Sequence, residues 1–149
     1  MTLPLTFTVE EAMVFAKQDC LEEWVHLFLK TIGGNVPFSE GLKRERRNWA
    51  GPLLLPLHEL ERCCGPEPEM EFYTPAESWD AHVGELITSL REGWSSPPLI
   101  VQVIEEGRLS IRDGNHRHKA LRRLGEPAAW VILWNTDGET DLGAWTGAR

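Results

Sequence analysis

The sequence contains only three cysteines, Cys20, Cys63 and Cys64, and their spacing matches no metal-binding pattern. An odd and sparse set of cysteines is typical of a reducing compartment, so we expect a cytoplasmic protein. A signal-peptide pattern and a long apolar run are both missing, so we expect neither export nor a membrane partner. Positive charge is also scarce, since the formal net charge is -8. Broad nucleic-acid binding needs a basic surface that displaces counterions, and this charge disfavours it.

The composition that remains is that of an ordinary globular protein. Of the 149 residues, 42% are hydrophobic and 26% are charged. This length is sufficient for one domain with a sizeable core. We expect an N-terminal helical extension at residues 1–50, a core at 51–135 and a C-terminal tail at 136–149.

The N-terminal extension has the apolar periodicity of a helical hairpin over residues 8–32. Thr8 with Glu11 forms a capping-box signature, and Asp19 with Glu22 repeats it before the second helix. The apolar stripe of such a hairpin packs against the core or against a partner.

A basic run, Lys43 to Arg47, follows the hairpin and precedes Trp49. Basic residues beside a tryptophan favour nucleic-acid binding through phosphates and base stacking. The same run is equally typical of a solvated helix face, and a third interpretation is that it supplements a phosphate site elsewhere in the chain. These alternatives stay open at the level of sequence.

The remaining pattern is that of an α+β fold. Apolar, β-branched residues predict strands at 99–104 and 109–111, separated by a glycine-containing turn. A helix is expected to begin near Asn115 and to end at Gly125, and a buried strand to follow at 129–134.

The junction between the second of these strands and the helix is a candidate anion site. Asp113 and Gly114 break the strand pattern just before the helix begins. The first N–H groups of a helix lack intrahelical acceptors, and with the helix dipole they attract anions. His116, Arg117 and Lys119 lie in the first turns, where positive side chains reduce helix stability. A bound phosphate would offset that loss.

Each residue of this junction has a candidate role. Gly114 allows a tight turn and close approach of a phosphate. Asn115 and His116 offer N–H groups and side-chain donors, and Arg117 offers charge-assisted hydrogen bonds. Asp113 has three open interpretations: a ligand of Mg²⁺, an acceptor of the substrate's proton, or a brace for His116 or the loop.

The segment Ile111–Gly125, IRDGNHRHKALRRLG, resembles the ParB/sulfiredoxin-like superfamily, whose members share a GxHR or GERR loop followed by a helix. Leu53–Leu60 is similar to the opening strand and turn of the same domain, and the resemblance covers residues 52–134. It implies a small mixed sheet with flanking helices. It also implies that the loop binds the phosphates of ATP, ADP or CTP, with Mg²⁺ as the expected metal.

Details of the motif narrow this resemblance. Asn115 occupies the position of the catalytic cysteine in sulfiredoxin, so sulfinic-acid reduction is not expected. The Asp-Gly-x-His-Arg form is closest to the free-serine kinases, in which this aspartate and a glutamate of the first loop serve catalysis. The resemblance therefore implies catalytic roles for Asp113 and for Glu67 or Glu69, with Glu71 as a third choice. Each glutamate is also readily explained as a solvated loop acid.

Two classes of function follow from this resemblance. One is a nucleotide-dependent phosphotransferase or hydrolase, acting on a small hydroxyl compound such as free serine, with electrostatic clamping of the phosphates. The other is a non-catalytic nucleotide-sensing or DNA-associated module that engages a partner through the N-terminal hairpin. An interaction module without a nucleotide is a third alternative. The sequence leaves the oligomeric state open.

Overall fold

The computed structural model describes residues 4–139 and 141–145. Over these residues the chain forms five α-helices, a five-stranded mixed sheet and a two-stranded parallel pair, which confirms the expected α+β class. The helices are α1 (Val9–Lys17), α2 (Leu21–Lys30), α3 (Val36–Leu42), α4 (Ala76–Arg91) and α5 (Asn115–Arg123). The strands are β1 (Arg47–Pro56), β2 (Leu60–Arg62), β3 (Cys64–Gly65), β4 (Phe72–Tyr73), β5 (Leu99–Val103), β6 (Leu109–Asp113) and β7 (Ala128–Thr136). Three 3₁₀ turns complete the chain: η1 (Leu57–Glu59), η2 (Glu105–Gly107) and η3 (Leu142–Trp145).

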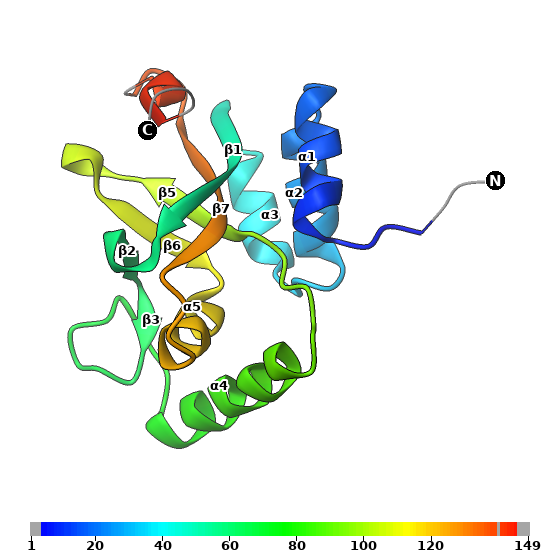
Figure 1. Cartoon of the computed structure of the whole chain (residues 1–149). Coiled ribbons are helices and arrows are strands. Elements are labelled where there is room, and N and C mark those ends of the chain that lie inside the picture. Colours follow the sequence, from blue (N-terminus) through cyan, green and yellow to red (C-terminus); the bar gives the residue numbers. More distant parts are fainter. Residues whose placement is uncertain (1–3, 140, 146–149) are drawn as a thin grey trace.

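The strand order of the large sheet is β1-β7-β5-β6-β2. β1 with β7 and β5 with β6 are antiparallel pairs, whereas β5 with β7 and β2 with β6 are parallel. Helices α1, α2 and α3 lie to one side of the sheet, and α4 and α5 lie together below it (Figure 1). β1 and β2 form the two edges of the sheet.

The N-terminal helices bury one face of the sheet. The predicted hairpin is confirmed as α1 and α2, and its aromatic residues Trp24 and Phe28 pack into one cluster with Ile132 and Trp134 of β7. The third helix, α3, was not expected. It has only seven residues, which include a proline and a glycine, so its apolar period is too short to stand out.

Of the two capping boxes predicted for the hairpin, only the one at the start of α1 forms. The Thr8 hydroxyl accepts from the Glu11 N–H at 3.3 Å, as the capping box predicts. Asp19 does not cap α2, which was expected from the same signature. Asp19 has a left-handed backbone with φ of 60°, and Cys20 occupies the N-cap position without a side-chain hydrogen bond. The Asp19 carboxylate therefore stays outside the helix start.

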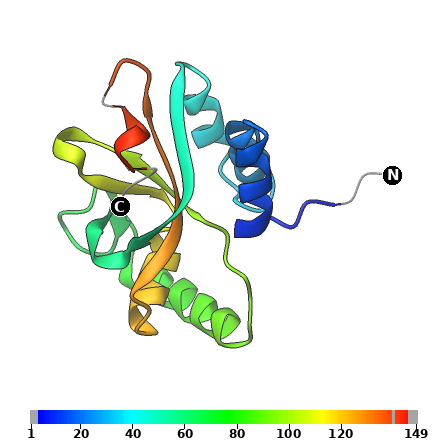
Figure 2. The ribbon, with the colours of Figure 1, turned by 45° about the horizontal axis from the view of Figure 1, so that its top comes forward.

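The opposite face of the sheet carries a second cluster. Val101, Ile111 and Leu133 form its centre, and Leu142 of η3 covers part of it. Figure 2 shows η3 on the side of the sheet away from α1, α2 and α3. Helix α5 packs between this sheet and α4, where Ala120 joins a third cluster. This packing holds the amino-terminal end of α5 in place.

The basic run lies mainly in the turn between α3 and β1. Arg47 donates to the carbonyl oxygens of Gly41 and Leu42, both at 3.1 Å, and its guanidinium lies 5.2 Å from the Trp134 ring centroid. Lys43 lies 3.9 Å from a Glu40 carboxylate oxygen. Two of the cations of the run thus have partners in the protein. In the described part of the chain, no helix has the length and apolar character needed to span a membrane.

Candidate functional site

Gly114 is the single residue between the end of β6 and the start of α5. Its backbone is left-handed, with φ of 106° and ψ of 20°. A Cβ at this position would lie 2.5 Å from a Leu99 methyl group and 2.9 Å from an Arg117 guanidinium nitrogen. Both the conformation and the close packing therefore require glycine here.

The first turn of α5 exposes its backbone donors. The first recorded bond of the helix runs from the His118 N–H to the Gly114 carbonyl oxygen at 2.9 Å. For the N–H groups of Asn115, His116 and Arg117, the described residues provide no acceptor. The first turn also holds no acidic residue. These donors and the helix dipole give the amino-terminal end of α5 the geometry that the sequence predicts for an anion site.

Two cavities meet at this junction, and Asp113, Gly114 and His116 line both. The larger, of about 570 Å³, is bounded by α3, β4 and the end of β6, and its aromatic walls are Phe38 and Phe72. The smaller, of about 310 Å³, lies between α2, α4 and the segment before β5. Its apolar and aromatic lining residues are Phe28, Ile32, Leu86 and Trp94. A ligand at the helix start therefore has room on either side.

The Arg117 side chain points into the protein. Its guanidinium donates to the carbonyl oxygens of Pro97 and Pro98 and to the Asp113 carboxylate. Only 9% of the side chain is exposed. Arg117 thus offers its backbone N–H to the junction, while its charge ties the segment before β5 to α5.

Asp113 is the partner of that charge. Its Oδ2 atom lies 2.9 Å from Arg117 Nη2. Burial raises the pKa of the Asp113 carboxyl, and the charge of Arg117 acts in the opposite direction. Of the three roles open to this residue, the contacts show the brace, which holds Arg117 rather than His116.

The side chains at the junction can be compared with those that usually bind Mg²⁺, the metal that the resemblance implies. The described part of the chain holds no group of three or more His, Cys, Asp or Glu side chains arranged around a metal position. Mg²⁺ is commonly bound by one or two carboxylates together with substrate phosphates and water. Asp113 with nucleotide phosphates is the combination that fits this pattern, because Asp113 lines both cavities.

The Asn115 side chain is also used within the fold. Its Oδ1 atom accepts from the backbone N–H groups of Cys63 at 2.8 Å and Cys64 at 3.3 Å. Its Nδ2 atom donates to the Ile111 carbonyl oxygen at 3.2 Å. Burial raises the pKa of the neighbouring Cys63 thiol, which disfavours the reactive thiolate. Asn115 therefore joins the turn after β2 to the start of α5.

His116 lines both cavities, as Asp113 does, and its ring packs against α4. Its ring centroid lies 4.2 Å from that of Trp79 and 4.2 Å from that of His82, both on α4. Burial, followed by the charges of His82 and Arg62, lowers the pKa of His116 to about 4. The ring is therefore neutral near pH 7 and adds no positive charge to the junction.

Three neighbours of His116 were missed at the level of sequence: Arg62, Trp79 and His82. The Arg62 guanidinium lies 4.9 Å from the Trp79 ring centroid. Trp79 and His82 are three residues apart, so helical spacing places them on one face of α4. The spacing of Trp79 and His82 indicates a shared helix face. The local sequence does not indicate that this face packs against a motif more than thirty residues further along the chain.

The glutamates expected to act as bases lie away from the cavities. Glu67 is paired with Arg62, whose hydrogen bonds lower the pKa of the carboxyl, and Glu71 is paired with Arg112 at 2.8 Å. Glu69 is exposed. Among the described residues, Asp113 is the only carboxylate that lines either cavity.

Comparison with known proteins gives matches among solved structures. No protein-family model and no curated protein sequence matches the chain. A Pnob8-like ParB-N domain matches with a TM-score of 0.42 and 17% identity, over 62% of this chain and 31% of that one. Sulfiredoxin from Arabidopsis thaliana matches with a TM-score of 0.38 and 23% identity, over 55% of this chain and 84% of that one. A mutant free serine kinase in complex with AMP matches with a TM-score of 0.39 and 16% identity, over 67% of this chain and 34% of that one.

A ParB-N domain, a sulfiredoxin and a free serine kinase are the kinds of protein that the DGNHR segment resembles in sequence. The matched region spans only about a third of the ParB-N and kinase chains. All three TM-scores lie below 0.5. The function proposed below therefore depends on the contacts of the site itself.

Proposed function

We propose that this chain binds a phosphorylated nucleotide, with the phosphates at the amino-terminal end of α5. The observation that carries the proposal is the set of three backbone N–H groups, at Asn115, His116 and Arg117, without acceptors among the described residues. They follow a glycine that no other residue can replace without strain, and they open onto two cavities. Such a helix start binds phosphate through its N–H groups and its dipole.

The charges around the junction also favour an anion. The pairing with Arg117 neutralises Asp113, so this carboxylate does not repel a phosphate. Arg112 lines the larger cavity with a side chain that is 22% exposed. It is held by Gln102 at 3.1 Å and by Glu71 at 2.8 Å. A cation held in this way forms charge-assisted bonds to phosphate oxygens at a small cost in side-chain entropy.

The larger cavity suits the nucleoside. Its volume of about 570 Å³ lies within the usual range for small-molecule sites. Phe38 and Phe72 provide aromatic surface against which a base can stack. ATP, ADP and CTP are the candidate nucleotides, because each combines a stacking base with a chain of phosphates.

A phosphotransferase is the second candidate function, and the two-sided arrangement favours it. The smaller cavity of about 310 Å³ has room for a small hydroxyl compound such as free serine on the other side of Gly114. Asp113 lines both cavities, and burial makes its carboxyl a better proton acceptor than an exposed one. In this reaction the hydroxyl proton passes to Asp113, the hydroxyl oxygen bonds to the terminal phosphorus, and the shortened nucleotide leaves. Glu67 and Glu69 remain proposed bases only if the loop that carries them moves toward the cavity.

Calorimetric titration with ATP, ADP and CTP, with and without Mg²⁺, tests the binding proposal. Arg112→Gln should weaken binding roughly tenfold, the loss of one hydrogen bond to a charged group. Arg108→Gln is the matched control, because Arg108 lies on the same hairpin but pairs with Glu61 and Glu105 away from the cavities. Absence of binding by all three nucleotides at about 1 mM would overturn the proposal.

Incubation with nucleotide and free serine, followed by ³¹P NMR, tests the second candidate. A phosphorylated acceptor that disappears in Asp113→Asn supports the phosphotransferase. Nucleotide that binds and stays intact with every hydroxyl acceptor identifies a non-catalytic nucleotide-sensing module instead.

A further inference from the structure

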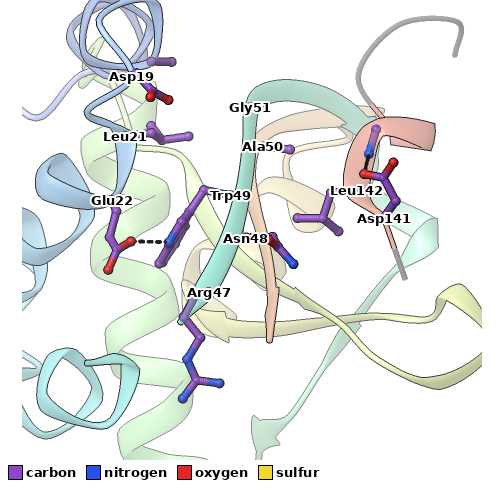
Figure 3. A pocket seen from close by; sticks show the side chains of 12 residues that line it. Asp19, Leu21, Glu22, Arg47, Asn48, Trp49, Ala50, Gly51, Asp141 and Leu142 are labelled. Carbon is purple, nitrogen blue, oxygen red and sulfur yellow. Dashed lines mark hydrogen bonds between the residues drawn. The ribbon is translucent and has the colours of Figure 1, made fainter. Parts of the chain in front are cut away.

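A cavity of about 640 Å³ lies along the outer edge of β1, between the turn that joins α1 to α2 and the 3₁₀ turn η3 (Figure 3). It shares no lining residue with the two cavities at α5. Five consecutive residues of β1, from Arg47 to Gly51, line this cavity. The feature that it exposes is therefore one edge of the central sheet.

The backbone of this edge has unused hydrogen-bonding groups. The Asp137 N–H donates to the Arg46 carbonyl oxygen at 2.8 Å, and β1 continues in register with β7 from there. Because pairing alternates along an antiparallel ladder, Asn48 bonds to β7, whereas Arg47 and Trp49 direct their N–H and C=O groups outward. For these outward groups, the part of the chain described by the structure supplies no partner.

The walls of the cavity are acidic on both sides of the strand. Figure 3 shows Asp19 and Glu22 beside one face of β1 and Asp141 beside the other. One cation lines the cavity, Arg47, and its guanidinium already donates to Thr136 and to two carbonyl oxygens. Three carboxylates and one cation therefore line the cavity along this strand edge.

We propose that the edge of β1 binds an extended segment of a partner protein that carries two consecutive basic residues. The segment adds to the sheet as a strand, and the outward groups of Arg47 and Trp49 form its main-chain hydrogen bonds. Successive side chains of a strand point to opposite faces of the sheet. One basic residue thus lies near Asp19 and the next near Asp141, and the net charge of -8 attracts such a segment.

The structure also limits the length of the added strand. Gly51 has φ of 120°, and the register with β7 shifts between Ala50 and Leu53. The regular edge therefore ends at Gly51, next to Pro52. A proline cannot donate a backbone hydrogen bond, so pairing cannot extend through it. The partner segment consequently pairs over only a few residues.

An acetylated and amidated peptide, Thr-Val-Arg-Lys-Val-Thr, provides the probe, with binding followed by NMR shifts of the Arg47 and Trp49 amides. We expect saturable binding that shifts these amides and leaves nucleotide binding unchanged. N-methylation of the peptide amides that face β1 should abolish binding, whereas N-methylation of the alternate amides should leave the affinity within twofold. Equal binding by both N-methylated peptides would overturn the proposal, because strand pairing would then contribute nothing.

Removal of the acidic walls tests the charge requirement. Asp19→Asn combined with Asp141→Asn should weaken peptide binding about fivefold at low salt, with a smaller change at high salt. Glu85→Gln combined with Glu92→Gln removes the same charge from exposed positions at α4 and should have no effect. Unchanged affinity in the first variant, or formation of a homodimer that covers β1 and excludes the peptide, would contradict a basic partner.

Discussion

Arg117 and Asp113 form an ion pair of 2.9 Å that spans the junction between β6 and α5, with side chains only 9% and 15% exposed. The pair encloses Gly114, where the chain changes from strand to helix. It also anchors the segment before β5, because Arg117 donates to the carbonyl oxygens of Pro97 and Pro98. The N–H groups at the start of α5 therefore owe their position to this buried side-chain pair.

Replacement of Arg117 should destabilise the fold strongly. In Arg117→Met, Asp113 stays buried without a counter-charge and two carbonyl oxygens lose their donor, at a cost of about 3–5 kcal/mol. Urea denaturation measures this loss. Arg122→Met, on the exposed side of the same helix, is the control and should change stability by less than about 0.5 kcal/mol. A loss of that small size in Arg117→Met would contradict the role assigned to the pair.

Asn115→Ala should lower the free energy of unfolding by about 2 kcal/mol. The backbone N–H groups of Cys63 and Cys64 then lose their acceptor in a buried site. Asn115→Asp restores an acceptor but cannot donate to the Ile111 carbonyl oxygen. Its free energy of unfolding should therefore lie between those of Asn115→Ala and the native protein. Thermal and urea unfolding rank the three proteins, and equal stability of all three would contradict the assignment.

Stability should fall as the pH decreases from about 6.5 to about 4, in part because of His116. Its pKa in the folded chain is about 4, below the ordinary value of 6.5. Within this window the unfolded chain binds more protons than the folded chain, so acid favours unfolding. His116→Gln removes this contribution, and its melting temperature should decline less over the same interval. Parallel declines in the two proteins would show that His116 does not contribute.

Gly114→Ala should abolish nucleotide binding and destabilise the protein. The added methyl group lies 2.5 Å from Leu99, and φ of 106° is strained for alanine. Gly84→Ala is the control, because a Cβ there meets no atom within 4 Å and the residue lies inside α4. It should raise stability by about 0.5–1 kcal/mol and leave binding unchanged. Calorimetric titration with ATP compares the two variants.

The helices with a long apolar period were predictable, and the short or irregular features were not. α1, α2 and α5 follow from apolar spacing, and α2 and α5 are each followed closely by glycine. α3 escaped notice because seven residues with a proline and a glycine show little period. The Asp19 cap was wrong because this residue closes α1 instead. Asp19 has a left-handed backbone, and the N–H groups of Asp19 and Cys20 donate to the carbonyl oxygens of Ala16 and Phe15 at 3.0 and 2.8 Å.

The strand–glycine–helix junction at Gly114 and the N–H groups after it are predictable from the amino-acid sequence. These depend on neighbouring residues alone, since glycine permits the turn and a helix start always lacks acceptors. Tertiary packing selects the side chains that surround the junction. It directs Arg117 toward the carbonyl oxygens of Pro97 and Pro98, and it brings Trp79 of α4 against His116. Such contacts join segments distant in the chain, and packing selects them rather than any local preference of the backbone.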